Sequence, residues 1–146
     1  MFTLDELKKE WGIDCQIDSS RLDDASIRTA NLHQKYLDAL TDYKLRLFKL
    51  EKDYLRLRAI RIRYFNGQLT REELQENGWE QYQYKTPLKS EMEKMIESDD
   101  ALLAILDKQS YFKFCLEYCE EIMKSLRERN WQIRNAIEWR KFESGA

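Results

Sequence analysis

The chain is poor in the residues that interrupt helices and in those that build catalytic sites. Its 146 residues include four Gly, one Pro, three Cys and one His. Few helix breakers and a charged fraction of 36% are typical of all-α proteins with long helices. An odd number of cysteines without framework spacing favours a reducing, intracellular compartment. A chain of this length can bury about 70% of its unfolded surface, so it needs neither disulfides nor a metal to fold.

Long apolar runs are absent as well. The longest uncharged apolar run, residues 101–106, is far shorter than the ~20 residues that a membrane span needs. Residues 1–6 place acids before any apolar run, which is unlike a signal peptide. We therefore expect no membrane partner.

Catalytic and metal-binding patterns are also missing. The one histidine, His33, falls on a heptad track, where packing is its usual role. Cys115 and Cys119 share a helical face, but no further His or Cys cluster completes a zinc site, so buried thiols are expected. Neither a Gly-rich phosphate loop nor a Glu-x-x-His spacing occurs. These absences predict a protein that is not an enzyme and has no cofactor.

A long helix is the dominant predicted element. From about residue 21 to residue 65 there is no Gly or Pro, with Asn31 as a candidate break and Asn66-Gly67 as the end. Apolar residues recur along it in steps of four and three, the rhythm of a helix that packs lengthwise on another. We call them the inner seam: Tyr36, Leu40, Tyr43, Leu47, Leu50, Tyr54 and Leu57.

Shorter helices are predicted on both sides. Thr3 and Glu6 form a capping box for a helix that Gly12 should end. Thr70 and Glu73 form a second box for a helix that Gly78 should close.

The C-terminal region should then form helices in a hairpin-like arrangement. Thr86-Pro87 favours a helix start, and residues 98–100 should cap the next helix, with a candidate kink at Asn130. We expect one domain, 1–146, with N-terminal helices in 1–70 and C-terminal helices in 86–146.

The long helix is too long to be enclosed by its own monomer. At 1.5 Å per residue, 45 residues span about 68 Å, whereas a compact globule of this size is roughly 40 Å across. The inner seam must meet another subunit or the C-terminal helices of its own chain. We favour self-association.

Cations are concentrated in one segment. Residues 25–70 carry ten basic and four acidic residues, whereas residues 71–108 carry five basic and ten acidic ones. Four cations form one helical stripe, with two more beside it and Tyr64 at its end, where an aromatic ring can stack on unpaired bases. The candidate DNA-binding residues are Lys49, Lys52, Arg56, Arg63, Arg58, Arg61 and Tyr64. The alternative is a solvated face that only pairs with the acidic segment.

Short fragments along nearly the whole chain carry one further signal. They are Leu7 to Lys9, Ile17 to Leu22, Lys35 to Leu37, Leu50-Glu51, Ala59 to Gly67, Lys89 to Met92, Cys119, Arg129, Ile133, Arg140, Phe142, Glu143 and Gly145. Together these fragments resemble the UvsY family of phage recombination mediators. Residues 59–67 fit the family's basic, tyrosine-ended motif, and the tail keeps the family's order and spacing.

This resemblance implies a ring-like homo-oligomer of six or seven subunits that binds single-stranded DNA in the cytoplasm of the bacterial host. It implies a role in recombination, repair and replication of DNA. The family loads a RecA-like recombinase onto DNA coated by the phage single-strand binding protein. Its C-terminal part is associated with oligomerisation, where we expect contacts from Phe112, Ile122, Leu126, Trp131, Ile133 and Ile137.

The motif departs from the family pattern at two positions. Its Lys falls on Ala59, its Arg is kept as Arg61, and Arg63 stands where the pattern has an acid. Arg58 is a candidate replacement for the missing cation. Two readings without DNA stay open: a coiled-coil scaffold or adaptor, and a catalytic helical bundle with a bound metal or cofactor.

Overall fold

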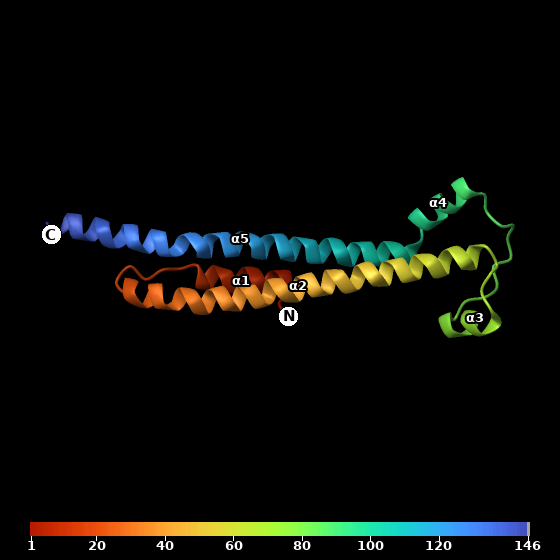
Figure 1. Ribbon diagram of the computed structural model, residues 1–146, viewed down its shortest axis with the longest axis horizontal. Helices are drawn as coiled ribbons and strands as arrows, with labels where there is room; N and C mark the ends of the chain where they lie inside the picture. Colours follow the sequence, from red (N-terminus) through yellow and green to blue (C-terminus); the bar gives the residue numbers. More distant parts are fainter. Residues whose placement is uncertain (146) are drawn as a thin grey trace. The chain divides into compact units, whose positions relative to one another are not determined.

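The computed structural model describes residues 1–145, which form five α-helices and no strand (Figure 1). The helices are α1 (Leu4–Asp14), α2 (Leu22–Phe65), α3 (Arg71–Asn77), α4 (Lys89–Glu97) and α5 (Asp100–Glu143). The all-α prediction is confirmed, and the long helix begins and ends within one residue of the predicted bounds.

The helices form two compact units. Unit 1 consists of Met1–Arg46 and Phe112–Ala146, and unit 2 consists of Leu47–Tyr111. Helices α2 and α5 each contribute to both units. The division therefore cuts across the predicted N-terminal and C-terminal halves of the chain.

Unit 1 is held by an apolar core between α1, α2 and α5 (Figure 1). Tyr36 and Tyr43 of α2 are completely buried there, and the ring of Trp11 packs edge-on against Tyr36 with centroids 5.5 Å apart. The other buried members are Leu7, Leu32, Ala39, Cys115, Cys119, Ile122, Met123 and Leu126.

A buried aspartate at the end of α1 joins the same three helices, through its carboxylate to α2 and through its backbone carbonyl to α5. Asp14 is 4% exposed and accepts hydrogen bonds from Lys35 Nζ at 2.7 Å, Tyr36 Oη at 2.8 Å and Arg28 Nη2 at 3.1 Å. Arg129 of α5 donates to the Asp14 carbonyl at 2.8 Å. Burial alone would raise the pKa of Asp14, but hydrogen bonds from Lys35 and Tyr36 and the positive charges of Lys35 and Arg28 hold that pKa below its usual range.

Unit 2 has its own core between the end of α2, α4 and the start of α5. Phe65, Ile96 and Leu102 are buried there. The half-buried residues that pack against them are Tyr54, Leu57, Ile62, Tyr64, Tyr82, Met92 and Met95.

The inner seam is confirmed as a packing surface, since each of its residues is buried or half-buried. In both units the residues that cover it come from the chain's own helices, including α5. Of the two partners considered for this seam, the structure shows the C-terminal helices, so our preference for self-association through the inner seam was wrong.

Three glycines and two asparagines were assigned as helix ends or breaks, and three of these five predictions were wrong. Gly67 follows the end of α2 with a left-handed φ of +67°, as predicted. Gly78 closes α3 with a left-handed φ of +68°, as predicted. Gly12, however, lies inside α1, because the contacts of Asp14 outweigh the ~1 kcal/mol that a helical glycine costs. Helices α2 and α5 pass through Asn31 and Asn130 without a break, since the adjacent Leu32 and Arg129 are anchored in the core.

Two further local predictions need correction. Helix α4 begins two residues after the predicted Thr86-Pro87 start, because the Glu91 carboxylate accepts the N–H of Leu88 at 3.1 Å and sets the first turn there. His33 is exposed, and Leu32 takes the buried position on that turn of α2.

Candidate nucleic-acid interface

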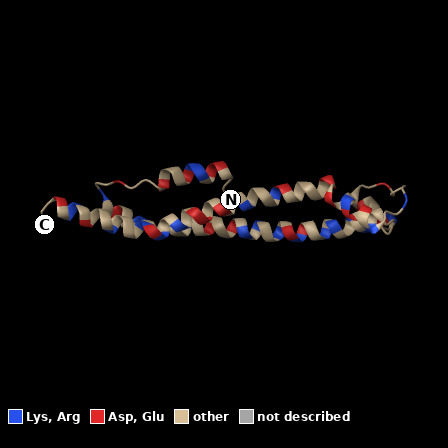
Figure 2. Cartoon of the chain, turned by 90° about the horizontal axis from the view of Figure 1, so that it is seen from above, with Lys and Arg blue, Asp and Glu red and all other residues tan. Residues whose placement is uncertain are grey.

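Four cations on the part of α2 that belongs to unit 2 face solvent. Lys49, Lys52, Arg56 and Arg58 are all exposed, and Figure 2 colours the basic residues of this helix blue. Across residues 1–145 none of the four forms an ion pair or a side-chain hydrogen bond. Lys52 makes only a cation–π contact, with its ammonium 4.3 Å from the centroid of the Phe48 ring. These cations are therefore not neutralised by the acidic segment within their own chain.

Three of the four cations share one side of the helix. At about 100° per residue, Lys49, Lys52 and Arg56 fall within an arc of about 60°, together with Arg63. Arg58 follows Arg56 by about 200°, so it points to the opposite side. The stripe predicted from spacing is real, but Arg58 does not extend it.

Arg61, the one cation of the family motif that is retained, is held inside unit 2. Its Nη2 and Nε lie 2.6 and 2.7 Å from Oδ2 of Asp99, and its side chain is only 18% exposed. The guanidinium also lies 4.7 to 5.0 Å from the ring centroids of Tyr64, Phe65 and Trp79. Because Asp99 also accepts the N–H of Leu102 in the first turn of α5, the pair joins the end of α2 to the start of α5.

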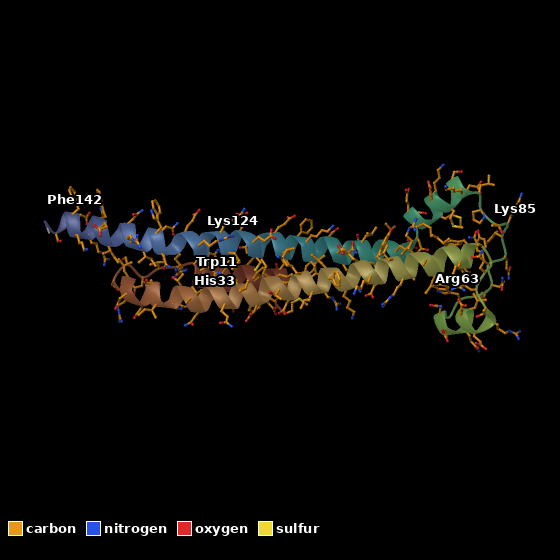
Figure 3. All side chains as sticks on the ribbon, in the orientation of Figure 1. Trp11, His33, Arg63, Lys85, Lys124 and Phe142 are labelled. Atoms are coloured by element: carbon orange, nitrogen blue, oxygen red, sulfur yellow. The ribbon has the colours of Figure 1, made fainter. Side chains whose placement is uncertain are left out.

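Tyr64 and Arg63 are engaged as well. The Tyr64 hydroxyl donates to the Glu80 carbonyl at 2.7 Å, and its ring packs against Phe65, Trp79 and Tyr82. Arg63, labelled at the end of α2 in Figure 3, pairs with Glu73 of α3 at 2.9 Å. The hydrogen bond from Arg63 lowers the pKa of Glu73. Tyr64 is thus less open to a nucleic-acid base than its place in the sequence suggests.

Sequence reasoning missed a more accessible aromatic. Tyr84 is 79% exposed, and its ring lies 5.4 Å from that of Tyr82 in the irregular segment after α3. The clustering of aromatic residues between 79 and 84 was visible in the sequence, but nothing there distinguished the exposed ring from the packed ones.

The predicted oligomerisation residues divide into two groups. Ile122 and Leu126 are buried in the apolar core of unit 1, and Phe112 is half-buried against that core. Ile133 is buried in a separate small cluster with Leu22 and Ala25. Their side chains support the fold of the single chain, which leaves Trp131 at 65% and Ile137 at 38% as the exposed candidates.

Two of the three cysteines belong to the apolar core of unit 1. Cys115 and Cys119 are completely buried, as expected, and the Cys119 thiol donates to the Tyr36 carbonyl at 3.2 Å. Burial raises the pKa of Cys119 to about 11. Within residues 1–145, no group of three or more His, Cys, Asp or Glu side chains is arranged to hold a metal ion. In that same range, no helix is sufficiently long and apolar to span a membrane.

Comparisons with known proteins agree with this architecture. Residues 10–146 match the family model for UvsY, described as a recombination, repair and single-stranded-DNA-binding protein. The recombination protein uvsY of Enterobacteria phage T4 is 23% identical over 142 residues, which cover 97% of this chain and 98% of the phage protein.

Solved structures show the same fold. A crystal structure of the bacteriophage T4 recombination mediator protein UvsY, in lattice type II, superimposes with a TM-score of 0.80 at 22% identity and covers 99% of both chains. A second lattice form, type IV, gives 0.78 at 20% identity, covering 97% of this chain and 99% of the other. With a family match that spans all but the first nine residues, the chain belongs to the UvsY family of recombination, repair and single-stranded-DNA-binding proteins.

Proposed function

We propose that this chain is a non-enzymatic recombination mediator that binds single-stranded DNA as a homo-oligomer and promotes the loading of a RecA-like recombinase onto DNA coated by the phage single-strand binding protein. The site of action is the cytoplasm of the bacterial host. Family membership supports the recombination role. The rest of the proposal depends on the geometry of α2.

The observation that carries the DNA-binding part is the stripe of exposed, unpaired cations. Lys49, Lys52 and Arg56 present ammonium and guanidinium groups on one side of a rigid helix. Groups arranged in this way can neutralise successive phosphates of a flexible strand and release its counterions. Arg58 adds a cation on the other side of the helix, and the exposed Tyr84 offers a ring for stacking.

The engaged residues have a different part in this proposal. Arg61, Arg63 and Tyr64 fix the end of α2 against Asp99, Glu73 and the aromatic segment. They thereby hold the exposed cations on an ordered helix, and Arg63, at 44% exposure, can also reach a phosphate with its outer edge.

Assembly would turn weak single sites into strong binding. A few phosphate contacts per chain give modest affinity, but linked copies raise the effective concentration, and avidity can exceed the affinity of one site by ~10²–10⁴-fold. A ring of six or seven subunits would hold one strand at many points. A strand bent or stretched in this way would be bound less tightly by the coating protein, which favours nucleation of the recombinase.

The experiment is a salt titration of binding to fluorescent oligo-dT. The logarithm of the affinity should fall with the logarithm of the salt concentration, with a slope of about −0.7 per phosphate contacted. An unlabelled duplex of equal length should compete poorly. Salt-independent binding, or a preference for duplex, would contradict the proposal, and no binding at low salt would favour the scaffold alternative.

A further inference from the structure

A second apolar seam runs along the outside of α2 in unit 2. Its residues follow one another in steps of four, three, four and three: Phe48, Lys52, Leu55, Ala59 and Ile62. Phe48 is 57% exposed and Leu55 is 64% exposed, although both are large apolar side chains. This outer seam lies about 150° around the helix from the inner seam. The chain's own core reaches only its last residue, Ile62, which is half-buried against the core of unit 2, and leaves the rest of the seam open.

The spacing of the outer seam indicates what would cover it. Apolar residues at alternating steps of three and four fit the side chains of a second helix that runs alongside. Exposed apolar groups gathered on one side of a helix mark an association surface more often than isolated ones do. The occupant expected on this surface is therefore an amphipathic helix.

The charges beside the outer seam restrict the choice of helix. Lys52 lies within the seam, and Arg63, Arg56 and Lys49 follow one of its edges. Of the two acids of this stretch, Glu51 lies along the other edge and Asp53 lies beyond Lys49, so the cations outnumber the acids around the seam. Two copies of the outer seam placed face to face would bring these cations together, which is unfavourable. The occupant must instead carry carboxylates, so a contact between two copies has to join unlike surfaces.

The same chain carries such a surface on α5 in unit 1. Phe114, Glu117, Glu121 and Glu128 are all exposed and fall within an arc of about 60°, which we call the acidic face. Lys124 lies beside them and pairs with Glu121 at 2.8 Å, which leaves Glu117 and Glu128 without an ion pair among residues 1–145.

The two surfaces match in length as well as in charge. The outer seam and the acidic face each extend over 14 residue steps, or about 21 Å of helix. Each has a phenylalanine at its N-terminal end, Phe48 at 57% exposure and Phe114 at 59%.

We propose that the outer seam of one copy docks on the acidic face of a second copy. This proposal rests on the homo-oligomer of the proposed function and names the surfaces that build it. In a pair, one copy uses its outer seam and keeps its acidic face free, and the other copy does the reverse. Further copies can bind at these free faces, and repetition of the contact closes a ring or extends a filament. Lys52 would face the neighbour's carboxylates, while Lys49 and Arg56 would line the rim of the contact and remain open to DNA.

Two variants, each altering one face, test the pairing. Leu55→Asp places a charge in the outer seam, and Phe114→Asp places one on the acidic face. Both sites are exposed in the single chain, so the fold should survive, as helical circular dichroism would verify. Leu88→Asp is the matched control, since Leu88 is equally apolar, 68% exposed and outside both faces.

Sedimentation velocity gives the outcome. Each of the two variants alone should sediment as a monomer, the Leu88→Asp control should match the native oligomer, and an equimolar mixture of the two variants should form a 1:1 dimer through the one intact pair of faces. A native-sized Leu55→Asp or Phe114→Asp oligomer would overturn this pairing but leave DNA binding and assembly standing. A mixture that stays monomeric would also overturn it, whereas a native chain that is itself monomeric would refute the oligomeric part of the proposed function too.

Discussion

Replacing Arg61 by Ala tests whether this arginine stabilises the fold or contacts DNA. The guanidinium is 18% exposed, and its partner Asp99 is 4% exposed. Removing one member of a buried ion pair leaves the other charge uncompensated, which costs about 3–5 kcal/mol. Because Arg61 keeps some contact with solvent, we expect a loss of about 3 kcal/mol, a large fraction of the stability of a domain of this size.

The assay combines urea unfolding with the salt titration on oligo-dT. Arg61→Ala should unfold at a markedly lower urea concentration, yet the salt slope of DNA binding, measured where the variant is folded, should stay the same. Arg58→Ala is the control. Its guanidinium is exposed and unpaired within residues 1–145, so its stability should change by less than about 0.5 kcal/mol. Its salt slope should become shallower by about 0.7 if it contacts one phosphate.

The opposite pattern would refute this reasoning. If Arg61→Ala keeps native stability and loses about 0.7 of the salt slope, the guanidinium contacts phosphate and the pair with Asp99 is dispensable. A double variant, Arg58→Ala with Arg61→Ala, should bind DNA more weakly while its oligomer stays intact. If that double variant dissociates, these arginines support assembly.

Three more predictions concern the fold. Asp14→Asn should lower stability at neutral pH by about 2 kcal/mol, since Lys35, Tyr36 and Arg28 lose a charged hydrogen-bond acceptor while Lys35 keeps its pair with Glu10. In the native chain the lowered pKa of Asp14 means that this stabilisation is present above about pH 4 and lost as the pH falls further, so the acid limb of a thermal-melting profile should flatten in the variant. A thiol reagent at pH 8 should label Cys15 quickly, and should label Cys115 and Cys119 only on unfolding, because both are buried and the pKa of Cys119 is about 11; two fast thiols would contradict the buried assignment. Gly78→Ala should cost about 1 kcal/mol in calorimetry, since a Cβ at φ +68° is strained even though it meets open space; unchanged melting would mean that α3 ends differently.

The helices could be predicted from sequence because their signals are local. Thr3 and Thr70 cap their helices as expected, and the heptad steps from Tyr36 to Leu57 mark a surface that is buried. Where prediction failed, a tertiary contact outweighed a local preference. The bonds to Asp14, for example, carry α1 past Gly12.

The site was harder to predict for the same reason. Periodicity places Lys49, Lys52 and Arg56 on one stripe, but it cannot show that Arg61 meets an aspartate 38 residues later in the sequence. The outer seam is the weaker of the two heptad tracks in α2, because Lys52 and Ala59 interrupt its large apolar residues. An outer seam becomes recognisable only when the structure shows that Phe48 and Leu55 are exposed.

Native mass spectrometry of the chain with and without one equivalent of oligo-dT per expected ring tests the central claim most directly. If a homo-oligomer that presents one basic helix per subunit binds single-stranded DNA, the spectrum should show a discrete oligomer that takes up one strand. The oligomer should release that strand as the salt concentration rises. A monomer whose mass is unchanged by the oligonucleotide at low ionic strength would contradict the account.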